Sequence, residues 1–205
     1  MFVPKGYDPP DPSWVIQLVK QYPLAILVTG QPGSCPVATH VPTILESGSL
    51  ETGTILGHMN RQNPHWDAIQ AGGPALVIYH GVHGYVSPSV YKTSPAAPTW
   101  DFTAVHVRGQ LSVLPEHETL GVIKRTVLTF EASHGTAWEM AESLRYFDQL
   151  LPGVGAFRIT VERVEAMFKL SQEQRADTRE LVANWFEEDG WSDRKELAKL
   201  IRRTI

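Results

Sequence analysis

Residues 102–114 read FTAVHVRGQLSVL, and this stretch indicates the fold class more clearly than any other. Its apolar positions are Val105, Val107, Leu111 and Val113. The positions between them hold His106, Arg108, Gln110 and Ser112. Successive side chains of a strand point to opposite faces, so the alternation predicts a β-strand with one apolar and one polar, histidine-bearing face. We expect the polar face to line something other than the core of its own sheet.

Other short apolar runs, separated by turn residues, predict further strands. They cover residues 24–29, 35–45, 50–58, 75–87 and 154–170, with turns at 30–34 and at Ser47-Gly48. The chain holds 15 prolines and 16 glycines, which mostly stand between these runs. The spacing predicts an antiparallel barrel of about six or seven strands with inserted and appended helices, and therefore the α+β class.

Helix signals stand between and after the strands. A first helix is expected from an Asp11 N-cap and Pro12 to Pro23, and a short one from Asn63-Pro64 to the pair Gly72-Gly73. Residues 115–151 are expected to be helical, and residues 171–205 to form two charged helices that separate near Gly190. We therefore expect a barrel domain over residues 1–170 and a helical appendage of the same domain over 171–205.

Composition excludes several classes of protein. The 205 residues carry a net charge of -4, with no apolar run near the ~18 residues of a membrane span and no signal-like N-terminus. A soluble, cytoplasmic protein without a general affinity for nucleic acid is expected. A basic cluster near the C-terminus is interleaved with acidic residues, which predicts a solvated helix face. It comprises Arg194, Lys195, Lys199, Arg202 and Arg203.

The single cysteine, Cys35, excludes an internal disulfide, a cysteine-rich metal site and covalent haem attachment. The sequence also lacks the motifs of serine hydrolases, phosphate-binding loops, zinc proteases and dinucleotide folds. His80 and His83 are three residues apart. In a regular strand this spacing places them on opposite faces, which argues against a shared metal site.

The polar residues gather at strand ends and in loops, where binding groups usually lie. These segments are ATHVP (38–42), GHMN (57–60), NPHW (63–66), HGYVS (83–87) and PTWD (98–101). They offer imidazoles, hydroxyls and flat aromatic rings but few carboxylates. This inventory suits a planar aromatic cofactor better than hydrolysis by paired acids.

Five segments, in this order, resemble the successive motifs of the PaiB family, the FMN-binding negative transcriptional regulators. They are ATHVP (38–42), GHMNRQNPHW (57–66), HGYVSPSVY (83–91), PTWDFTAVHVRG (98–109) and FKLSQ (168–172). The resemblance runs from Met1 to about Gln172. It implies a split β-barrel of the flavin-reductase type, and a homodimer with a cofactor in the cleft between protomers.

Two features resemble the piperazate synthase branch of this family, which binds haem b instead of FMN. His65 stands in NPHW where some PaiB-like sequences carry glutamine, a residue not expected to ligate haem iron. The segment 169–173 reads KLSQE where the flavin-type proteins tend to read KLSQN, so Glu173 places a carboxylate near the expected FMN phosphate. The resemblance implies formation of an N–N bond by dehydrative cyclisation of N5-hydroxy-L-ornithine to L-piperazic acid.

The resemblance also implies site residues. His65 is the expected axial ligand of the haem iron, with His58 and His106 as rival ligands. Thr99 is the expected hydrogen-bond partner of the leaving hydroxyl, the alternative being a cap of the turn before Trp100. Five more residues are expected at the cofactor or its pocket, and each also has a purely structural interpretation as an ion-pair partner or packing residue. They are Arg108, Lys169, Tyr85, Ser87 and Trp100.

In the expected mechanism, ferric iron polarises the N–O group, a proton donor assists loss of water, and the α-amine attacks the nitrogen. An alternative is a flavin-binding regulator or oxidoreductase that holds FMN through Arg108, Lys169 and Ser171. A third is a DNA-binding repressor. The negative charge and the lack of an evident helix-turn-helix argue against it.

Overall fold

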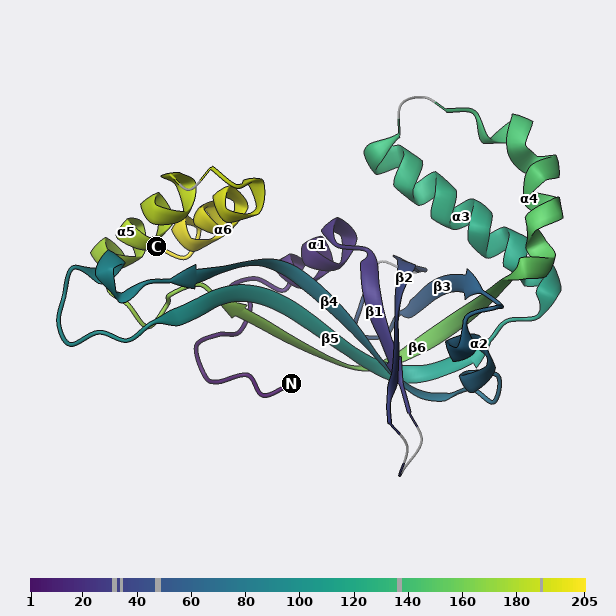
Figure 1. The fold of residues 1–205 in the computed structure, drawn as a ribbon, viewed down its shortest axis with the longest axis horizontal. Coiled ribbons are helices and arrows are strands. Elements are labelled where there is room, and N and C mark those ends of the chain that lie inside the picture. The colour runs from purple at the N-terminus through teal and green to yellow at the C-terminus, as the bar shows by residue number, and fades with distance from the viewer. Residues whose placement is uncertain (31–32, 34, 47–48, 136–137, 189) are drawn as a thin grey trace. The chain divides into compact units, whose positions relative to one another are not determined.

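Six strands form a closed barrel in the order β1–β2–β3–β6–β5–β4 (Figure 1). The structure is a computed structural model that describes all residues except 31–32, 34, 47–48, 136–137 and 189. The strands are Leu24–Thr29 (β1), Val37–Leu45 (β2), Thr54–Asn60 (β3), Gly73–Val86 (β4), Thr99–Val113 (β5) and Val154–Lys169 (β6). This confirms the predicted barrel and the α+β class; most of the predicted turn 30–34 and all of Ser47-Gly48 lie outside the described residues.

Strand pairing is antiparallel in the four pairs for which the register is defined. β1 lies between β2 and β4, with Ile26 opposite His40 on one side and Ile78 on the other. β2 also pairs with β3, and β3 with β6. The alternation predicted in β5 is confirmed, because Val105, Val107 and Leu111 are buried whereas Arg108, Gln110 and Ser112 are exposed.

Helices stand between and after the strands. The α-helices are Ser13–Gln21 (α1), Pro64–Ala68 (α2), Glu116–His134 (α3), Leu144–Leu150 (α4), Ala176–Glu188 (α5) and Ser192–Arg202 (α6). Short 3-10 turns cover Pro88–Tyr91 (η1), Met140–Ser143 (η2) and Leu151–Gly153 (η3). The two predicted C-terminal helices on either side of Gly190 are confirmed.

Three helix predictions need correction. The continuous helix over 115–151 is wrong, because α3 ends at His134 and the backbone turns to an extended conformation at Gly135. The N-cap of α1 is Pro12, although Asp11 Oδ1 still accepts the backbone N–H of Ser13 at 2.6 Å. The short helix α2 ends at Ala68, before the glycine pair that was expected to close it.

The chain divides into two compact units, described here separately. The first unit comprises residues 1–22, 80–105 and 165–205, and the second comprises 23–79 and 106–164. β4, β5 and β6 contribute residues to both units. The expected division at residue 170 stays a prediction.

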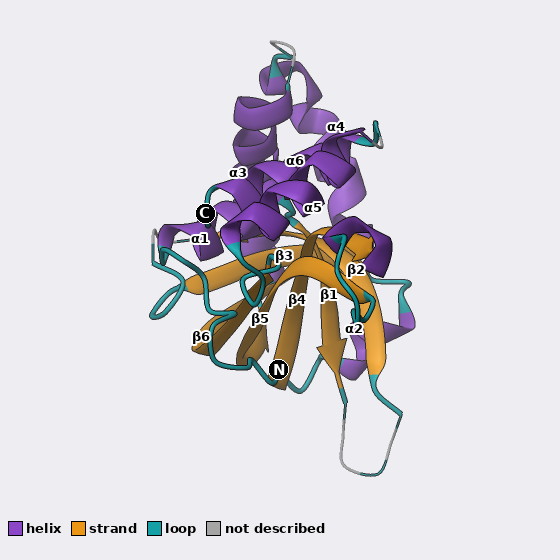
Figure 2. Cartoon of the chain, turned by 90° about the vertical axis from the view of Figure 1, so that its left-hand side faces the viewer, coloured by secondary structure: helices purple, strands orange, loops and turns teal. Residues whose placement is uncertain are grey.

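In the first unit, α5 and α6 lie side by side and bury one apolar face between them (Figure 2). Their buried residues are Val182, Ala183, Phe186, Leu197, Ala198 and Ile201. Gly84 of β4 permits this packing, since a Cβ there would collide with the ring of Phe186. Burial of a whole apolar face typically contributes several kcal/mol, which explains why two such charged helices are stable.

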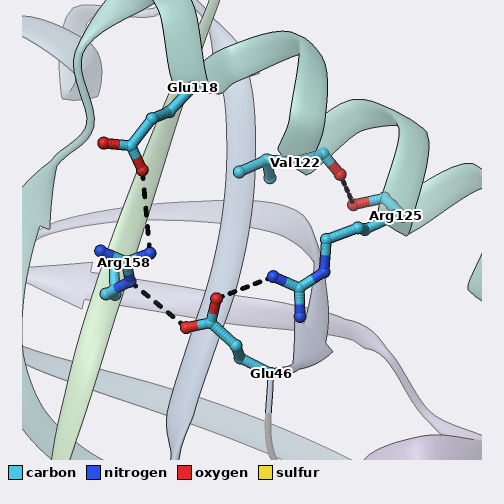
Figure 3. A network of polar contacts seen from close by, with 6 residues as sticks. Glu46, Glu118, Val122, Arg125 and Arg158 are labelled. Carbon is cyan, nitrogen blue, oxygen red and sulfur yellow. Dashed lines mark hydrogen bonds and ion pairs between the residues drawn. The ribbon is translucent and has the colours of Figure 1, made fainter.

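In the second unit, α3 packs on the barrel through Val122, which joins Ile44, Leu56, Leu114 and Ala156 in one apolar cluster. Figure 3 shows an ion-pair network beside this cluster. Glu46 accepts a hydrogen bond from Arg125 at 2.7 Å and lies 3.3 Å from Arg158, whose guanidinium is 3.8 Å from Glu118. The network therefore connects α3 to β6 and to the end of β2. Among the described helices, none is both long and apolar enough to cross a membrane.

Candidate cofactor and substrate sites

His65 is held at the start of α2 by local sequence. Asn63 caps the helix, and its Oδ1 accepts the backbone N–H of His65 at 2.9 Å. Pro64 occupies the first turn, where a missing N–H costs nothing because no helical partner exists there. This confirms the predicted Asn-Pro start, and it fixes the backbone that carries the imidazole. The side chain of His65 is 0% exposed.

Two threonine hydroxyls hold the buried imidazole of His65. Thr39 Oγ1 lies 2.9 Å from Nδ1, and Thr29 Oγ1 lies 2.8 Å from Nε2. Asn63 Nδ2 donates to the same Thr39 hydroxyl at 3.3 Å. Burial lowers the pKa of His65, so the ring is neutral at pH 7. A neutral imidazole keeps one nitrogen lone pair, which is the form that binds a metal ion.

A hollow of about 320 Å³ lies beside this imidazole, and Thr29 belongs to its wall. The rest of the wall is mostly apolar and consists of Gly30, Cys35, Val37, Ala68, Ile69, Ala71, Gly72, Gly73, Pro74 and Leu111. A largely apolar hollow with a few polar groups is a typical ligand environment; His65 lies behind Thr29 and is not part of its wall. The sequence patterns did not identify Thr29 or Thr39, because they lie on strands and meet His65 of α2 across 36 and 26 residues of chain.

The two rival histidines also belong to the second unit. His58 of β3 has a buried Nδ1 without a hydrogen-bond partner, and burial lowers its pKa. Its pKa shift and orphaned nitrogen keep it a candidate ligand. His106 lies half-buried in β5, where Arg108 is exposed on the same face, as predicted. His106 and Arg108 each take part in a polar, ring or electrostatic interaction.

In the first unit, the structure brings Thr99, Trp100 and Lys169 together. The Lys169 ammonium donates hydrogen bonds to Thr99 Oγ1 and, at 2.9 Å, to the carbonyl of Trp100. Because the Thr99 oxygen accepts from lysine, its own hydrogen is directed to another acceptor. The hydrogen-bonding role expected of Thr99 stays a prediction.

A buried acid stands behind this pair. Asp101, 0% exposed, accepts the Ser171 hydroxyl at 2.6 Å and the Ser171 backbone N–H at 3.2 Å. Burial raises the pKa of Asp101 to about 6, against the opposing effects of the Ser171 hydrogen bonds and the Lys169 charge. Ser171 is therefore committed to Asp101. The sequence patterns gave Asp101 no role, although it stands in the PTWD segment.

Aromatic rings and imidazoles line one face of β4 in the first unit. Trp100 is 54% exposed, and its ring lies 5.8 Å from that of Tyr85 and 6.1 Å from that of His83. The ring of His83 is 4.7 Å from that of His80. The prediction that these histidines face opposite sides is wrong, because Gly81 and the residue after it are both buried and the alternation shifts by one.

The remaining predicted residues take part in a helix cap or in surface ion pairs. Ser87 caps η1, where its hydroxyl is 2.8 Å from that of Ser89. Arg202 contacts Glu180 and Glu187, and Lys199 contacts Glu196, so this part of the basic cluster is paired on the surface as predicted. The described part of the chain contains no group of three or more residues placed to hold a bare metal ion.

Comparisons with known proteins agree with the motif order. A family model described as "Putative FMN-binding domain" matches residues 1–163. The Bacillus subtilis "Protease synthase and sporulation protein PAI 2" is 27% identical over 203 residues, covering 98% of this chain and 96% of that protein. Both matches extend over most of the chain.

Solved structures share the fold at low sequence identity. An FAD- and haem-binding protein from Mycobacterium smegmatis superposes with a TM-score of 0.58 at 16% identity, covering 88% of this chain and 79% of its own. The conserved protein Rv2991 from Mycobacterium tuberculosis gives 0.59 at 12% identity, covering 85% and 94%. The barrel is therefore the split barrel of flavin-binding proteins, and the chain belongs to the FMN-binding, PaiB-like family that its motifs predicted.

Proposed function

We propose that this chain is a haem-dependent piperazate synthase. It would bind haem b through His65 and convert N5-hydroxy-L-ornithine to L-piperazic acid with loss of one water. The observation that carries the proposal is the buried, neutral imidazole of His65, which contacts Thr39 through Nδ1 and, through Nε2, the Thr29 hydroxyl on the wall of a largely apolar hollow. A glutamine at this position would offer no such ligand for iron.

The surroundings of His65 fit an axial ligand. With Nδ1–H donating to Thr39, the lone pair of Nε2 faces the Thr29 hydroxyl on the wall of the hollow. A metal ligand of this kind usually donates its other ring N–H to a fixed partner, which orients the ring and raises its basicity. For Nε2 to bind iron, the Thr29 side chain would have to move its Oγ1, which lies 2.8 Å from Nε2, out of that position. When bound, ferric haem supplies a Lewis acid for the N–O group.

The Thr99–Lys169 pair would provide the proton that the reaction needs. In the net step the N–O bond breaks, the α-amine electron pair forms the N–N bond, and no electrons are gained or lost overall. The departing hydroxyl would leave as water after taking a proton from Thr99, which Lys169 would restore, and the proton released by the attacking amine would return to Lys169. Holding the chain in a folded conformation makes this ring closure an intramolecular reaction with a large proximity advantage.

The comparisons support a cofactor of the flavin or haem class without identifying which one. One protein of the same fold, from Mycobacterium smegmatis, binds FAD and haem according to its description. The proposal includes a homodimer, as the family resemblance implies, and a small amino acid as the substrate. His58, with its unpartnered ring nitrogen, is the alternative iron ligand.

Absorption spectroscopy of the purified protein tests the cofactor. We expect a Soret band in the wild type, and a lost or displaced band in His65→Ala with the His58→Ala band unchanged. A matched control is His117→Ala on the surface helix α3. An unchanged Soret band in His65→Ala, with loss in His58→Ala, would transfer the ligand role to His58.

The second candidate function is a flavin-binding regulator or oxidoreductase, which the description of the family model favours. The acidic surroundings of residues 169–173, where the FMN phosphate is expected, argue against this second function. The Ser171 hydroxyl donates its hydrogen bond to Asp101, and Glu173 adds a second carboxylate on the wall of the cavity that Lys169 also lines. A dianionic phosphate is repelled by this arrangement. A flavin spectrum in the purified protein would favour this second function and contradict the first.

A further inference from the structure

A second cavity, of about 530 Å³, lies entirely within the first unit. Its wall is polar in part and combines residues of the N-terminal segment, the loop before β5 and the end of β6. They are Tyr7, Tyr91, Thr93, Pro95, Ala96, Ala97, Pro98, Thr99, Lys169, Glu173 and Gln174. The proposed proton transfer uses only Thr99 and Lys169, so the acid and the hydroxyl on the same wall have no role in it.

The basic group of this cavity has donor capacity beyond its internal contacts. An ammonium group has three N–H donors. Lys169 uses one on Thr99 and one on the carbonyl of Trp100, and its nitrogen stands 5.9 Å from the ring centre of Tyr7. One N–H therefore remains for a ligand. The internal bonds also fix the ammonium in place, which lowers the entropy cost of binding an anionic group.

The acidic group of the cavity is similarly placed and only partly used. Glu173 Oε2 accepts a hydrogen bond from the Tyr7 hydroxyl at 3.2 Å. A carboxylate has about four acceptor sites, so the group can still accept from a ligand ammonium. The side chain of Glu173 is exposed, so an incoming cation reaches it without displacing protein atoms.

We propose that this cavity binds the headgroup of an α-amino acid, with the ligand carboxylate on Lys169 and the ligand ammonium on Glu173. One fixed cation and one fixed carboxylate in the same cavity complement a zwitterion, whereas a phosphate group requires a surplus of cations. The buried Asp101 adds negative charge behind Lys169 and further disfavours a polyanion. The assignment of this amino acid as N5-hydroxy-L-ornithine rests on the proposed function.

Calorimetric titration of the full-length protein tests this inference with three ligands. L-Ornithine carries both headgroup charges, 1,4-diaminobutane lacks the carboxylate, and 5-aminopentanoate lacks the α-amine. Glu173→Gln should weaken the binding of L-ornithine by about tenfold or more and leave the affinity for 5-aminopentanoate unchanged. Lys169→Met should weaken the binding of L-ornithine and of 5-aminopentanoate and leave the affinity for 1,4-diaminobutane unchanged. Glu188→Gln, an exposed acid at the end of α5, should leave all three affinities unchanged.

The pattern across ligands separates binding from a structural effect. Equal weakening of all three ligands by Glu173→Gln, unchanged L-ornithine affinity in both variants, or no L-ornithine binding by the wild type would each overturn the inference. Failure of the proposed function has a different signature. The expected binding pattern without any cyclised product would contradict the synthase activity and leave the headgroup site in place.

Discussion

Replacing Asp101 with asparagine should change how the stability of the protein depends on pH. Burial raises the pKa of this carboxyl from 3.8 to about 6 in the folded protein. The folded state therefore binds the proton more tightly than the unfolded state does. The resulting stability is fully present below about pH 4 and is lost as the pH rises through about 6.

The structure gives the size of this effect. A shift of about 2 pH units at about 1.4 kcal/mol per unit means that ionisation of Asp101 costs the wild type about 3 kcal/mol. Asparagine has nearly the same shape and cannot ionise, and its amide oxygen can still accept the backbone N–H of Ser171. The stability of Asp101→Asn relative to the wild type should therefore rise by about 2 kcal/mol between pH 4 and pH 7, because part of the effect has already been expressed at pH 4.

Urea denaturation of both proteins at several pH values measures this difference. The lowered pKa values of His58 and His65 act in the opposite direction, since their stability is present above pH 6.5 and lost as the pH falls. They are common to both proteins and cancel in the difference. Asp148→Asn, at an exposed position, serves as the control. A difference between Asp101→Asn and wild type that does not vary with pH would refute the reasoning.

Three further predictions concern other parts of the structure. Thr39→Val should weaken haem binding by about tenfold or more, measured by haem titration, because the imidazole loses the partner of its Nδ1. Gly155→Ala should lower stability by about 1–3 kcal/mol in thermal unfolding, because a Cβ would enter the ring of Trp66, whereas Gly153→Ala, with open space around it, should not. Glu46→Gln should lower the free energy of unfolding by about 1 kcal/mol or less, and this loss should be smaller in high salt.

Local signals predicted much of the fold. The alternation in β5 and the Asn63-Pro64 start of α2 are decided by residues within a few positions of each other, and both are confirmed. The break after α3 was missed because residues 115–151 carry apolar groups throughout, whereas the backbone leaves the helix at Gly135. The shift between His80 and His83 was missed because it appears only when the burial of the intervening residues is known.

The candidate sites were predicted less completely, because their contacts join residues that are far apart in the sequence. His65 and the pair Thr99 and Lys169 lie in segments whose order resembles a family, so they could be proposed as site residues. Their partners could not, because Thr39 of β2 meets His65 of α2 across 26 residues and Asp101 meets Ser171 across 70 residues. Contacts of this length depend on the complete barrel, and no local pattern encodes them.

Formation of the N–N bond tests the central claim most directly. The haem-loaded protein is incubated with N5-hydroxy-L-ornithine labelled with nitrogen-15 at both nitrogens, and the product is followed by NMR and mass spectrometry. We expect a cyclic product lighter than the substrate by one water, with a one-bond coupling between the two labelled nitrogens that His65→Ala abolishes. Unchanged substrate in the presence of protein with a full complement of haem would contradict it.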